Sequence, residues 1–461
     1  MKKRRMYLNA FSMNCVVHQS PGLWVRPESR MVDYKDLNTW VELAKLLERG
    51  KFDALFLADV VGVYDVFNGN RDAAARSATQ LPVNDPMLLI PAMAQVTKNL
   101  GFGFTSGLLQ YPPYTFARLV STLDFLTNGR VGWNIVTSYL ESAGRAYGLD
   151  GLPEHDERYE MADEYCEAVY KLWEASWADD AVVKDVENGI YSDPSKILDV
   201  DHHGKYYKFK GCHLTEPSPQ RSPILFQAGA SPRGREFAAR HAECAFFLGP
   251  NAKVDGEYIA DVRKLTAATG RDPNDILCYA YMKIITGGTE EEARRKYDDY
   301  FSQIDYESAM ALMSGWSGLD FGELDPDMKI EYVETNAMRT MLQGFAEADP
   351  DKEWTVRDVA NYAGIGGAGP VLVGAAEQIA DELEEWTEHG VDGFNIAYGV
   401  TPGSFEDFID GVVPILQQRG RVQKEYSEGT LREKLYGSGR SRISMPHPAA
   451  QIRREAWGEG N

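Results

Sequence analysis

The sequence predicts an α/β protein, a (β/α)8 (TIM) barrel with insertions, and three observations support this fold. Short β-rich apolar runs alternate with longer amphipathic segments from the first residues almost to the last. The alternation gives about eight strand–helix units, which is the number and order of a (β/α)8 barrel. The chain is also long enough, because it has 461 residues and a minimal barrel needs about 250. A doubly wound open sheet remains the alternative, since it shows the same alternation.

The predicted strands are short runs rich in β-branched, aromatic and other apolar residues, as is typical of a buried parallel sheet. In chain order they span 6–11, 53–58, 100–105, 130–136, 224–228, 242–248, 277–286 and 393–397. Between them, apolar residues recur at helical spacing, as Leu37, Trp40, Ala44 and Leu47 do in the first such segment. The predicted helices span 37–49, 87–96, 116–126, 158–173, 233–240, 256–269, 376–389 and 405–418.

About 200 residues exceed the needs of a minimal barrel, and two segments account for many of them. Residues 179–222 are rich in turn-forming residues, and residues 300–369 carry short helical patterns of their own. We therefore predict a single barrel domain over 1–420 with insertions at about 179–222 and 300–369. The polar tail, 421–461, is predicted to be an arm that packs along the surface or on a partner subunit.

Composition excludes several classes of partner. The chain carries 69 Asp and Glu against 48 Lys and Arg, a net charge of −21. Such a surface repels phosphate backbones and anionic headgroups, so neither nucleic acid nor a membrane is an expected partner. Five scattered cysteines without a C-x-x-C pair indicate a reduced protein. The basic start MKKRR lacks the unbroken apolar run of a signal peptide, and the expected location is cytoplasmic.

Polar residues follow four of the predicted strands, and on a barrel the carboxyl ends of the strands carry the functional site. The four segments are Phe11-Ser12-Met13-Asn14 with His18 shortly after, Ala58-Asp59, Asn134-Ile135-Val136-Thr137-Ser138, and Gln227-Ala228-Gly229-Ala230-Ser231. Each segment alone is a turn or a helix cap as readily as a ligand contact. Four of them on one face indicate a binding site.

The segment after 224–228 has the features of a phosphate site. Ser231 is a typical N-cap residue and Pro232 a typical first residue of a helix. The small residues before them let backbone N–H groups approach an anion, which the helix dipole favours. Arg158 and Tyr159, behind His155, could contact the same phosphate. The alternatives are an ordinary helix start and a surface ion pair between Arg158 and Asp156 or Glu160.

Other familiar motifs do not fit their required context. The pattern GIGGAG at 364–369 precedes a predicted strand instead of following one into a helix, so we interpret it as a turn and not as a dinucleotide site. His202 and His203 are adjacent residues that point apart, and no metal site is predicted there. A metal-dependent barrel hydrolase would need His-x-His at the end of the first strand, where Asn9-Ala10-Phe11 stands.

Several long segments resemble the bacterial-luciferase-like flavin monooxygenases, from about residue 6 to 420. The branch is that of nitrilotriacetate, dibenzothiophene-sulfone and long-chain alkane monooxygenases. The segments are LERGKFDALFLAD, YPPYTFARLVSTLDFLTNGRVGWNIVTS, HDERYEMADEYCEAVYKLWE, SPQRSPILFQAGASPRGREFAARHAE and GVDGFNIAY with PGSFEDFIDGVVPILQQRGR. Within the branch, NAFSMNCVVHQSPGLW, FLADVVGVYDVF and HPAAQIR are most similar to dimethyl-sulfide monooxygenases. Riboflavin lyase is a neighbour in the same branch.

The resemblance implies a barrel with reduced FMN at its carboxyl-terminal face. The matching positions are Phe11, Ala58 and Asp59 along the isoalloxazine, Asn134, Val136 and Ser138 along the ring edge and ribityl chain, and His155, Arg158, Tyr159, Ala230 and Ser231 at the phosphate. In the family, oxygen adds to the reduced flavin to give a peroxide. His18 matches a position near the reaction centre, where a protonated imidazole could stabilise that peroxide; the alternative is a core histidine.

The resemblance also implies partners. A separate NAD(P)H:flavin reductase would supply the reduced flavin, and O₂ and a small organic or organosulfur molecule such as dimethyl sulfide would be the substrates. Residues 60–84 and 300–369, which match the family least, are expected to shape the substrate pocket, and the second segment to form a mobile cover. A homodimer or homotetramer is expected. The alternative functions are riboflavin lyase, a flavin-storing barrel without activity, and a metal-dependent hydrolase.

Overall fold

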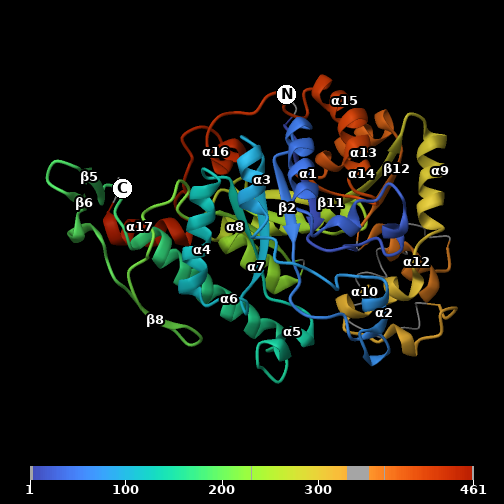
Figure 1. Ribbon diagram of the computed structural model, residues 1–461, viewed down its shortest axis with the longest axis horizontal. Coiled ribbons are helices and arrows are strands. Elements are labelled where there is room, and N and C mark those ends of the chain that lie inside the picture. The colour runs from blue at the N-terminus through green and yellow to red at the C-terminus, as the bar shows by residue number, and fades with distance from the viewer. Residues whose placement is uncertain (1–3, 230, 330–351, 368, 459–461) are drawn as a thin grey trace.

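The computed structural model describes residues 4–229, 231–329, 352–367 and 369–458. Eight parallel strands form a closed barrel surrounded by helices (Figure 1). The strands are β1 (Tyr7–Met13), β2 (Ala54–Ala58), β3 (Gly101–Gly107), β4 (Val131–Val136), β9 (Ile224–Ala228), β10 (Cys244–Phe247), β11 (Leu277–Gly287) and β13 (Gly393–Ala397). The predicted (β/α)8 barrel is confirmed. The open sheet is excluded, because β10 pairs with β11 and β13 pairs with β1, which closes the ring.

Strand β11 is long enough to pair twice along one edge. Its first residues pair with β10, and its last five pair with a ninth strand, β12 (Val371–Ala375). Strand β12 therefore extends the sheet above the end of β10 without being part of the ring. It positions the chain that returns from the second insertion.

Aromatic side chains fill the barrel. Successive residues of a strand point to opposite faces, so Phe11, Phe56, Phe226, Phe246 and Tyr281 all belong to one interior cluster. The ring centroid of Phe11 lies 5.6 Å from that of Phe56 and 5.4 Å from that of Phe246. The interior is thus a packed core, and Phe11 forms part of its upper layer.

Eight helical segments follow the barrel strands on the outside. They are α1 (Leu37–Arg49), α3 (Ile90–Val96), α4 (Pro113–Leu126), α6 (His155–Tyr170), α7 (Pro232–His241), α8 (Ala252–Ala268), α13 (Ala376–Glu388) and α14 (Gly403–Asp407) with α15 (Val413–Gln418). Helix α6 begins three residues before the predicted position, since Asp156 and Glu157 favour a helix N-terminus. The last predicted helix is interrupted by a π-helical turn, η8 (Phe408–Val412).

The first insertion contains two hairpins that the sequence did not predict. Strands β5 (Val182–Asp185) and β6 (Ile190–Ser192) form one, and β7 (Val200–His203) and β8 (Lys208–Gly211) form the other. The first hairpin projects at the left of Figure 1. Both strands of each hairpin are short and mostly polar, so their pattern is difficult to distinguish from that of loops.

The second insertion folds on the carboxyl-terminal side of the barrel. Its described helices are α9 (Glu290–Phe301), α10 (Tyr306–Ser317), η6 (Phe321–Glu323) and α12 (Val356–Gly366). Of these, α10, η6 and α12 share a small apolar core with η3 (Phe67–Gly69) and α2 (Asp72–Arg76) from the loop after β2. The two segments predicted to shape the pocket therefore pack against each other. The predicted cover includes residues 330–351, which lie outside the described residues.

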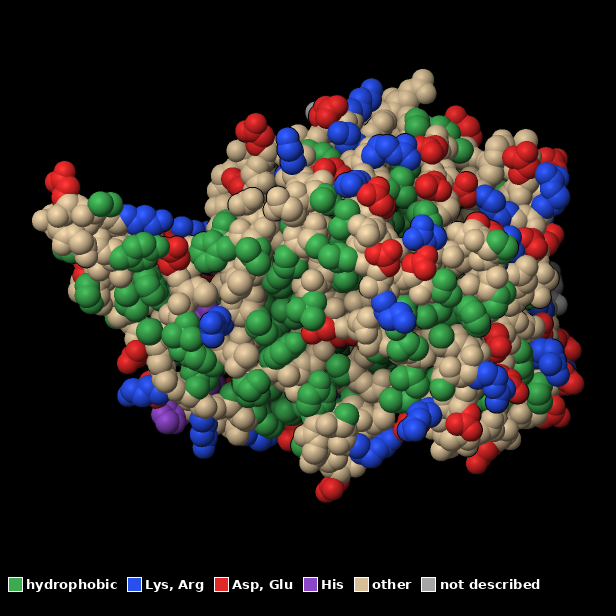
Figure 2. Space-filling view, viewed as in Figure 1, with side chains coloured by type: hydrophobic (Ala, Val, Ile, Leu, Met, Phe, Trp, Pro, Cys, Tyr) green, Lys and Arg blue, Asp and Glu red, His purple; other side chains and the backbone are tan. Residues whose placement is uncertain are grey.

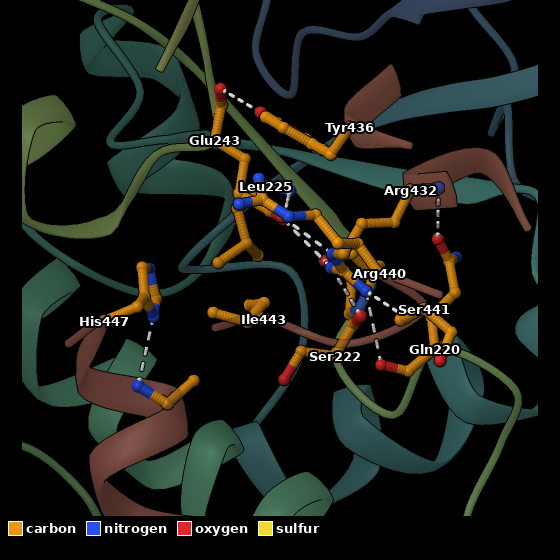
Figure 3. Close-up of polar contacts among 12 residues, drawn as sticks. Gln220, Ser222, Leu225, Glu243, Arg432, Tyr436, Arg440, Ser441, Ile443 and His447 are labelled. Atoms are coloured by element: carbon orange, nitrogen blue, oxygen red, sulfur yellow. Dashed lines mark hydrogen bonds and ion pairs between the residues drawn. The ribbon is translucent and has the colours of Figure 1, made fainter. Parts of the chain in front are cut away.

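The C-terminal arm closes the opposite end of the barrel. Helix α16 (Leu431–Tyr436) places Leu431 and Leu435 in the interior cluster. Beside them, Arg432 donates to both carboxylate oxygens of Glu243 at 2.7 and 2.9 Å (Figure 3). Helix α17 (Pro448–Trp457) follows and packs on α6. The arm was predicted on the surface, but its polar composition concealed the buried residues of α16.

The surface agrees with the acidic composition. On the face that Figure 2 shows, Lys and Arg are interspersed with Asp and Glu and form no large basic patch. Within the described ranges, no helix is long and apolar enough to cross a membrane. All five cysteines are free.

Candidate functional site

A cleft of about 380 Å³ opens at the carboxyl ends of β2, β3, β4 and β9. Its volume lies within the range of small-molecule and cofactor sites. It is lined by Asp59, Val60, Val61, Gly107, Gln110, Ile135, Val136, Thr137, Ser138, Tyr139, His155, Arg158, Tyr159, Gln227, Ala228, Gly229 and Ser231. Three of the four strand ends that the sequence indicated meet in this cleft.

The N-terminus of α7 forms one end of the cleft. Ser231 is the N-cap, as predicted, and its Oγ accepts a hydrogen bond from the N–H of Gly234 at 3.0 Å. A Cβ on Gly229 or on Gly234 would lie 2.8 Å from the hydroxyl of Tyr159, so both positions require glycine. The imidazole Nε2 of His155 lies 3.3 Å from Ser231 Oγ. Small residues, a helix N-terminus and a histidine are thus gathered where an anion would bind.

Arg158 faces this end of the cleft, and no carboxylate of the described residues forms an ion pair with it. Its Nη1 donates to the carbonyl oxygen of Pro153 at 3.2 Å, and its buried Nε has no partner among the described residues. The alternative of a surface ion pair is wrong, because Asp156 pairs with His155 and Glu160 with Lys205. Burial lowers the pKa of Arg158, which means that its charge lacks full compensation and would be stabilised by a bound anion.

Buried polar atoms without a partner among the described residues lie on the strands next to the cleft. Asn134 donates from Nδ2 to Thr105 Oγ1 at 3.0 Å, but its Oδ1 accepts nothing within the described chain. Ser106 Oγ and Gln227 Oε1 are also buried and unpartnered. Native proteins rarely leave such groups unsatisfied unless a ligand or water completes them. Their positions at the ends of β3, β4 and β9 fit a polar ligand lying across the top of the barrel.

Asp59 forms the opposite wall of the cleft. Gln110 Nε2 donates to its Oδ2 at 3.0 Å. Burial, with a smaller contribution from the nearby Asp85 carboxylate, raises the pKa of Asp59 to about 7. At neutral pH this carboxyl group can therefore donate or accept a proton, which suits a hydrogen bond to the edge of a heteroaromatic ring. Ala58 precedes it as the last residue of β2, beside the cleft but not among its lining residues.

His18 lies behind Phe11 and does not line the cleft. Its ring centroid is 4.7 Å from that of Phe11, and the residue is 4% exposed. Burial, together with the charge of Lys283, lowers the pKa of His18 to about 3. The imidazole is therefore neutral at neutral pH, and the protonated form that the resemblance suggested is disfavoured here. A role for His18 in the reaction stays a prediction.

A hydroxyl network beyond Asp59 was not found by sequence reasoning. The Tyr64 hydroxyl lies 2.5 Å from that of Tyr139 and 3.1 Å from Gln80 Oε1, and Trp316 Nε1 donates to it at 3.2 Å. Gln80 Nε2 donates in turn to the carbonyl oxygen of His18 at 2.7 Å. Gln80 has a φ of 49°, a conformation that non-glycine residues seldom adopt outside functional sites. These residues come from three distant segments, so no local motif signals them.

The predicted site residues fall into three groups. Those that line the cleft are Asp59, Val136, Ser138, His155, Arg158, Tyr159 and Ser231. Phe11, Ala58 and Asn134 are adjacent to it in the strands, and His18 is buried behind Phe11. Ala230 lies outside the described residues. Contact of any of them with FMN stays a prediction.

The GIGGAG segment and the histidine pair lie in ordinary secondary structure. Residues 364–366 end helix α12, and Gly367 is its C-cap with a φ of 68°, so GIGGAG does not begin a helix. His202 is buried and stacks on Phe209, whereas His203 is exposed beside Asp201. The pair lies in strand β7, whose alternation directs the two side chains to opposite faces. No cluster of metal-ligating side chains occurs in the described ranges.

Comparison with known proteins gives consistent matches over nearly the whole chain. The sequence profile of the luciferase-like monooxygenases matches residues 11–393. Dimethyl-sulfide monooxygenase of Hyphomicrobium sulfonivorans is 51% identical over 452 residues, which are 98% of this chain and 94% of the relative. Long-chain alkane monooxygenase of Geobacillus thermodenitrificans is 46% identical over 451 residues, which are 98% of each chain.

Solved structures agree with these sequence matches. The crystal structure of DmoA from Hyphomicrobium sulfonivorans superposes with a TM-score of 0.94 at 50% identity and covers 99% of this chain and 97% of that one. Riboflavin lyase, solved with modified FMN and riboflavin, superposes with a TM-score of 0.89 at 34% identity and covers 98% of this chain and 100% of that one.

Proposed function

The chain belongs to the luciferase-like monooxygenase family, and we propose that it oxidises a small organic or organosulfur molecule with O₂ and reduced FMN delivered by a separate NAD(P)H:flavin reductase. It is a flavin-dependent monooxygenase by its homologues. The observation that supports the specific proposal is the cleft, whose two ends have different chemistry. One end gathers Arg158, His155 and the N-terminus of α7, and the other is lined by Asp59, Val60, Val61 and Tyr139.

The residues present fit FMN. Arg158, Ser231 and His155 surround the N-terminus of α7, where a phosphomonoester would find a guanidinium, a hydroxyl and backbone N–H groups. Tyr159 places its hydroxyl against the same glycines. The unpartnered Nε of Arg158 is the orphaned donor that a phosphate would satisfy. Riboflavin, which lacks the phosphate, would leave this end unfilled.

The remaining residues suit the flat part of the cofactor. Phe11 and Ala58 would provide apolar contact to the isoalloxazine, and Asp59 a hydrogen bond at its edge. Asn134, Val136 and Ser138 would lie along the ring edge and the ribityl chain. Bound reduced FMN would supply the electrons that activate O₂. The protein binds and orients it and keeps water from the reacting atoms.

The substrate pocket is proposed beyond Asp59. Met13, Cys15, Val60, Tyr64, Leu140 and Leu312 form an apolar cluster there. The hydroxyl pair of Tyr64 and Tyr139 lies at its edge. Such a pocket fits a small apolar or sulfur-bearing molecule better than a charged one. Dimethyl sulfide is the first candidate, because the first relative reported above is named for it.

Riboflavin is the second candidate, because the riboflavin lyase structure covers the whole fold. A second flavin would need room beside the first, whereas Tyr64, Tyr139 and Trp316 are in hydrogen-bond contact across that space. The geometry therefore favours the small molecule. We test the choice by supplying FMN, a flavin reductase and NADH with each candidate and following its loss by mass spectrometry. If riboflavin is consumed and dimethyl sulfide is not, riboflavin replaces the small organic molecule as the proposed substrate.

The enzyme is further proposed to be a cytoplasmic homodimer or homotetramer. Apolar side chains gather over α4 on the face that Figure 2 shows. Leu126, the last residue of α4, is 57% exposed, and Val186, which follows β5 in the projecting hairpin, is 89% exposed. Exposed apolar residues in groups are typical of subunit contacts. Light scattering coupled to size exclusion would give the mass of the assembly, and a monomer would contradict this part.

A further inference from the structure

A lysine is buried inside the top of the barrel. Lys283 is on β11, where Leu277, Tyr279 and Tyr281 point inward, and the alternation of the strand directs Lys283 inward as well. Its Cα is paired with that of Ala397, which is paired with that of Phe11. Lys283 therefore lies at the level of Phe11, two strands and roughly 10 Å away. The side chain is fully buried.

The amine has few partners. Lys283 Nζ donates to Ser20 Oγ at 2.5 Å, and no carboxylate pairs with it in the described part of the chain. The titratable group that senses its charge is His18, from the segment after β1, whose pKa the charge of Lys283 helps to lower. The ring of Tyr398 lies 6.4 Å from that of His18, and Tyr281 is on the same strand as Lys283 and on the same face. The neighbouring strands contribute only Val371 and Ala397 at its level.

Other buried cations in the molecule are compensated. Arg432 pairs with Glu243, and Arg130 donates to four backbone carbonyl oxygens and to Thr97. Lys283 has a single hydroxyl acceptor. An unpaired buried ammonium is costly, and burial lowers the pKa of Lys283 to about 7. The amine is therefore poised to take up a proton if a negative charge enters the site.

Reduced and oxidised FMN differ in the charge of the isoalloxazine ring. Both carry the phosphate, but at neutral pH the ring of reduced FMN is anionic and that of oxidised FMN is neutral. A cation at the level of Phe11 would respond to the ring, whereas Arg158 would respond to the phosphate. Charge beside the ring is one of the means by which proteins tune a flavin.

We propose that Lys283 is a charge-compensating residue that takes up one proton from solvent when reduced FMN binds, so that the site selects reduced over oxidised FMN. The amine becomes an ammonium, the proton comes from the buffer, and no electron moves in this step. The inference rests on the proposed function, because it requires that the cleft binds FMN. Lys283 would respond to the charge of the ring, whereas the phosphate site binds a group that both forms of FMN carry.

The test is anaerobic calorimetry of FMN binding at pH 8, in two buffers with different enthalpies of protonation. Wild-type protein should take up close to one proton with reduced FMN and almost none with oxidised FMN. Lys283→Met, which replaces the aliphatic part of the side chain and removes the amine, should lose this uptake. Its preference for reduced FMN should fall about tenfold or more, since each pKa unit gained on binding corresponds to a factor of ten.

The matched control is Thr286→Val on the same strand, whose hydroxyl donates to the Gly374 carbonyl oxygen away from the interior. It should keep both the uptake and the preference. The inference is overturned if wild-type protein binds reduced FMN without proton uptake, a result that needs no variant. It is also overturned if Lys283→Met keeps the uptake and His18→Gln loses it. Wild-type protein that binds neither form of FMN would instead refute the proposed function, and this inference with it.

Discussion

Arg158→Ala should weaken the binding of FMN and leave that of riboflavin nearly unchanged. The guanidinium lines the cleft, has no acidic partner and keeps a buried Nε without an acceptor. A hydrogen bond to a charged group contributes about 1.5–3 kcal/mol. One such bond to the phosphate therefore corresponds to a loss of about 10- to 150-fold in affinity for FMN. Riboflavin has no phosphate, so it should lose little.

Flavin fluorescence or calorimetry with the oxidised forms measures both affinities without turnover. The control variant is Arg145→Ala, which removes an exposed guanidinium paired with Asp65 at 2.5 Å on the neighbouring helix α5 (Glu141–Ala146). Exposed pairs contribute little, so both affinities should stay at the wild-type values. Unchanged FMN affinity in Arg158→Ala would show that the phosphate site is wrongly placed. An equal loss for riboflavin would indicate a general disturbance of the cleft.

Three further predictions concern stability and the substrate pocket. Arg432→Ala should lower the free energy of unfolding by about 3–5 kcal/mol, because it leaves Glu243 buried without its partner. Denaturant titration measures this free energy, and a loss below about 1 kcal/mol would contradict the prediction. The free energy of unfolding should fall as pH drops below about 6.5, because burial lowers the pKa of His213 to about 4 and that of His447 further. The unfolded chain then binds protons that the folded chain excludes, and the loss at pH 5 is about 2 kcal/mol for His213. A thermal stability that stays constant from pH 7 to 5 would contradict this prediction. Tyr64→Phe should raise the KM for the substrate several-fold while the affinity for FMN stays constant, because only the hydroxyl network changes. Steady-state kinetics measures the KM, and a loss of FMN affinity in its place would refute the prediction.

The barrel could be predicted from sequence because its signals are local. Strand runs such as 224–228 and the cap Ser231 with Pro232 depend on neighbours within a few residues. The two hairpins of the first insertion have no such signal, since their strands are short and mostly polar. The buried face of α16 was hidden by the charge of Arg432, which the structure compensates with the carboxylate of Glu243, the residue before β10.

The phosphate end of the cleft was predicted for the same reason as the barrel, because it is built from one helix start and one short segment of α6. The residues at the substrate end of the cleft and the position of Lys283 were not predicted from the sequence. Tyr64, Tyr139 and Trp316 lie far apart in sequence, and their contact depends on how the second insertion packs on the loop after β2. Lys283 occurs in an apolar strand, and only the register with β13 and β1 places it beside Phe11.

The most direct test of the account is a single reaction without any nicotinamide. The protein is mixed anaerobically with photoreduced FMN and dimethyl sulfide, and then exposed to ¹⁸O₂. The account predicts loss of dimethyl sulfide in proportion to the reduced FMN supplied, with ¹⁸O in an organic product by mass spectrometry. It also predicts no oxidation of NADH by the purified protein unless a flavin reductase is added. Consumption of O₂ only as hydrogen peroxide with every small organic substrate offered, or turnover of NADH by the protein alone, would contradict it.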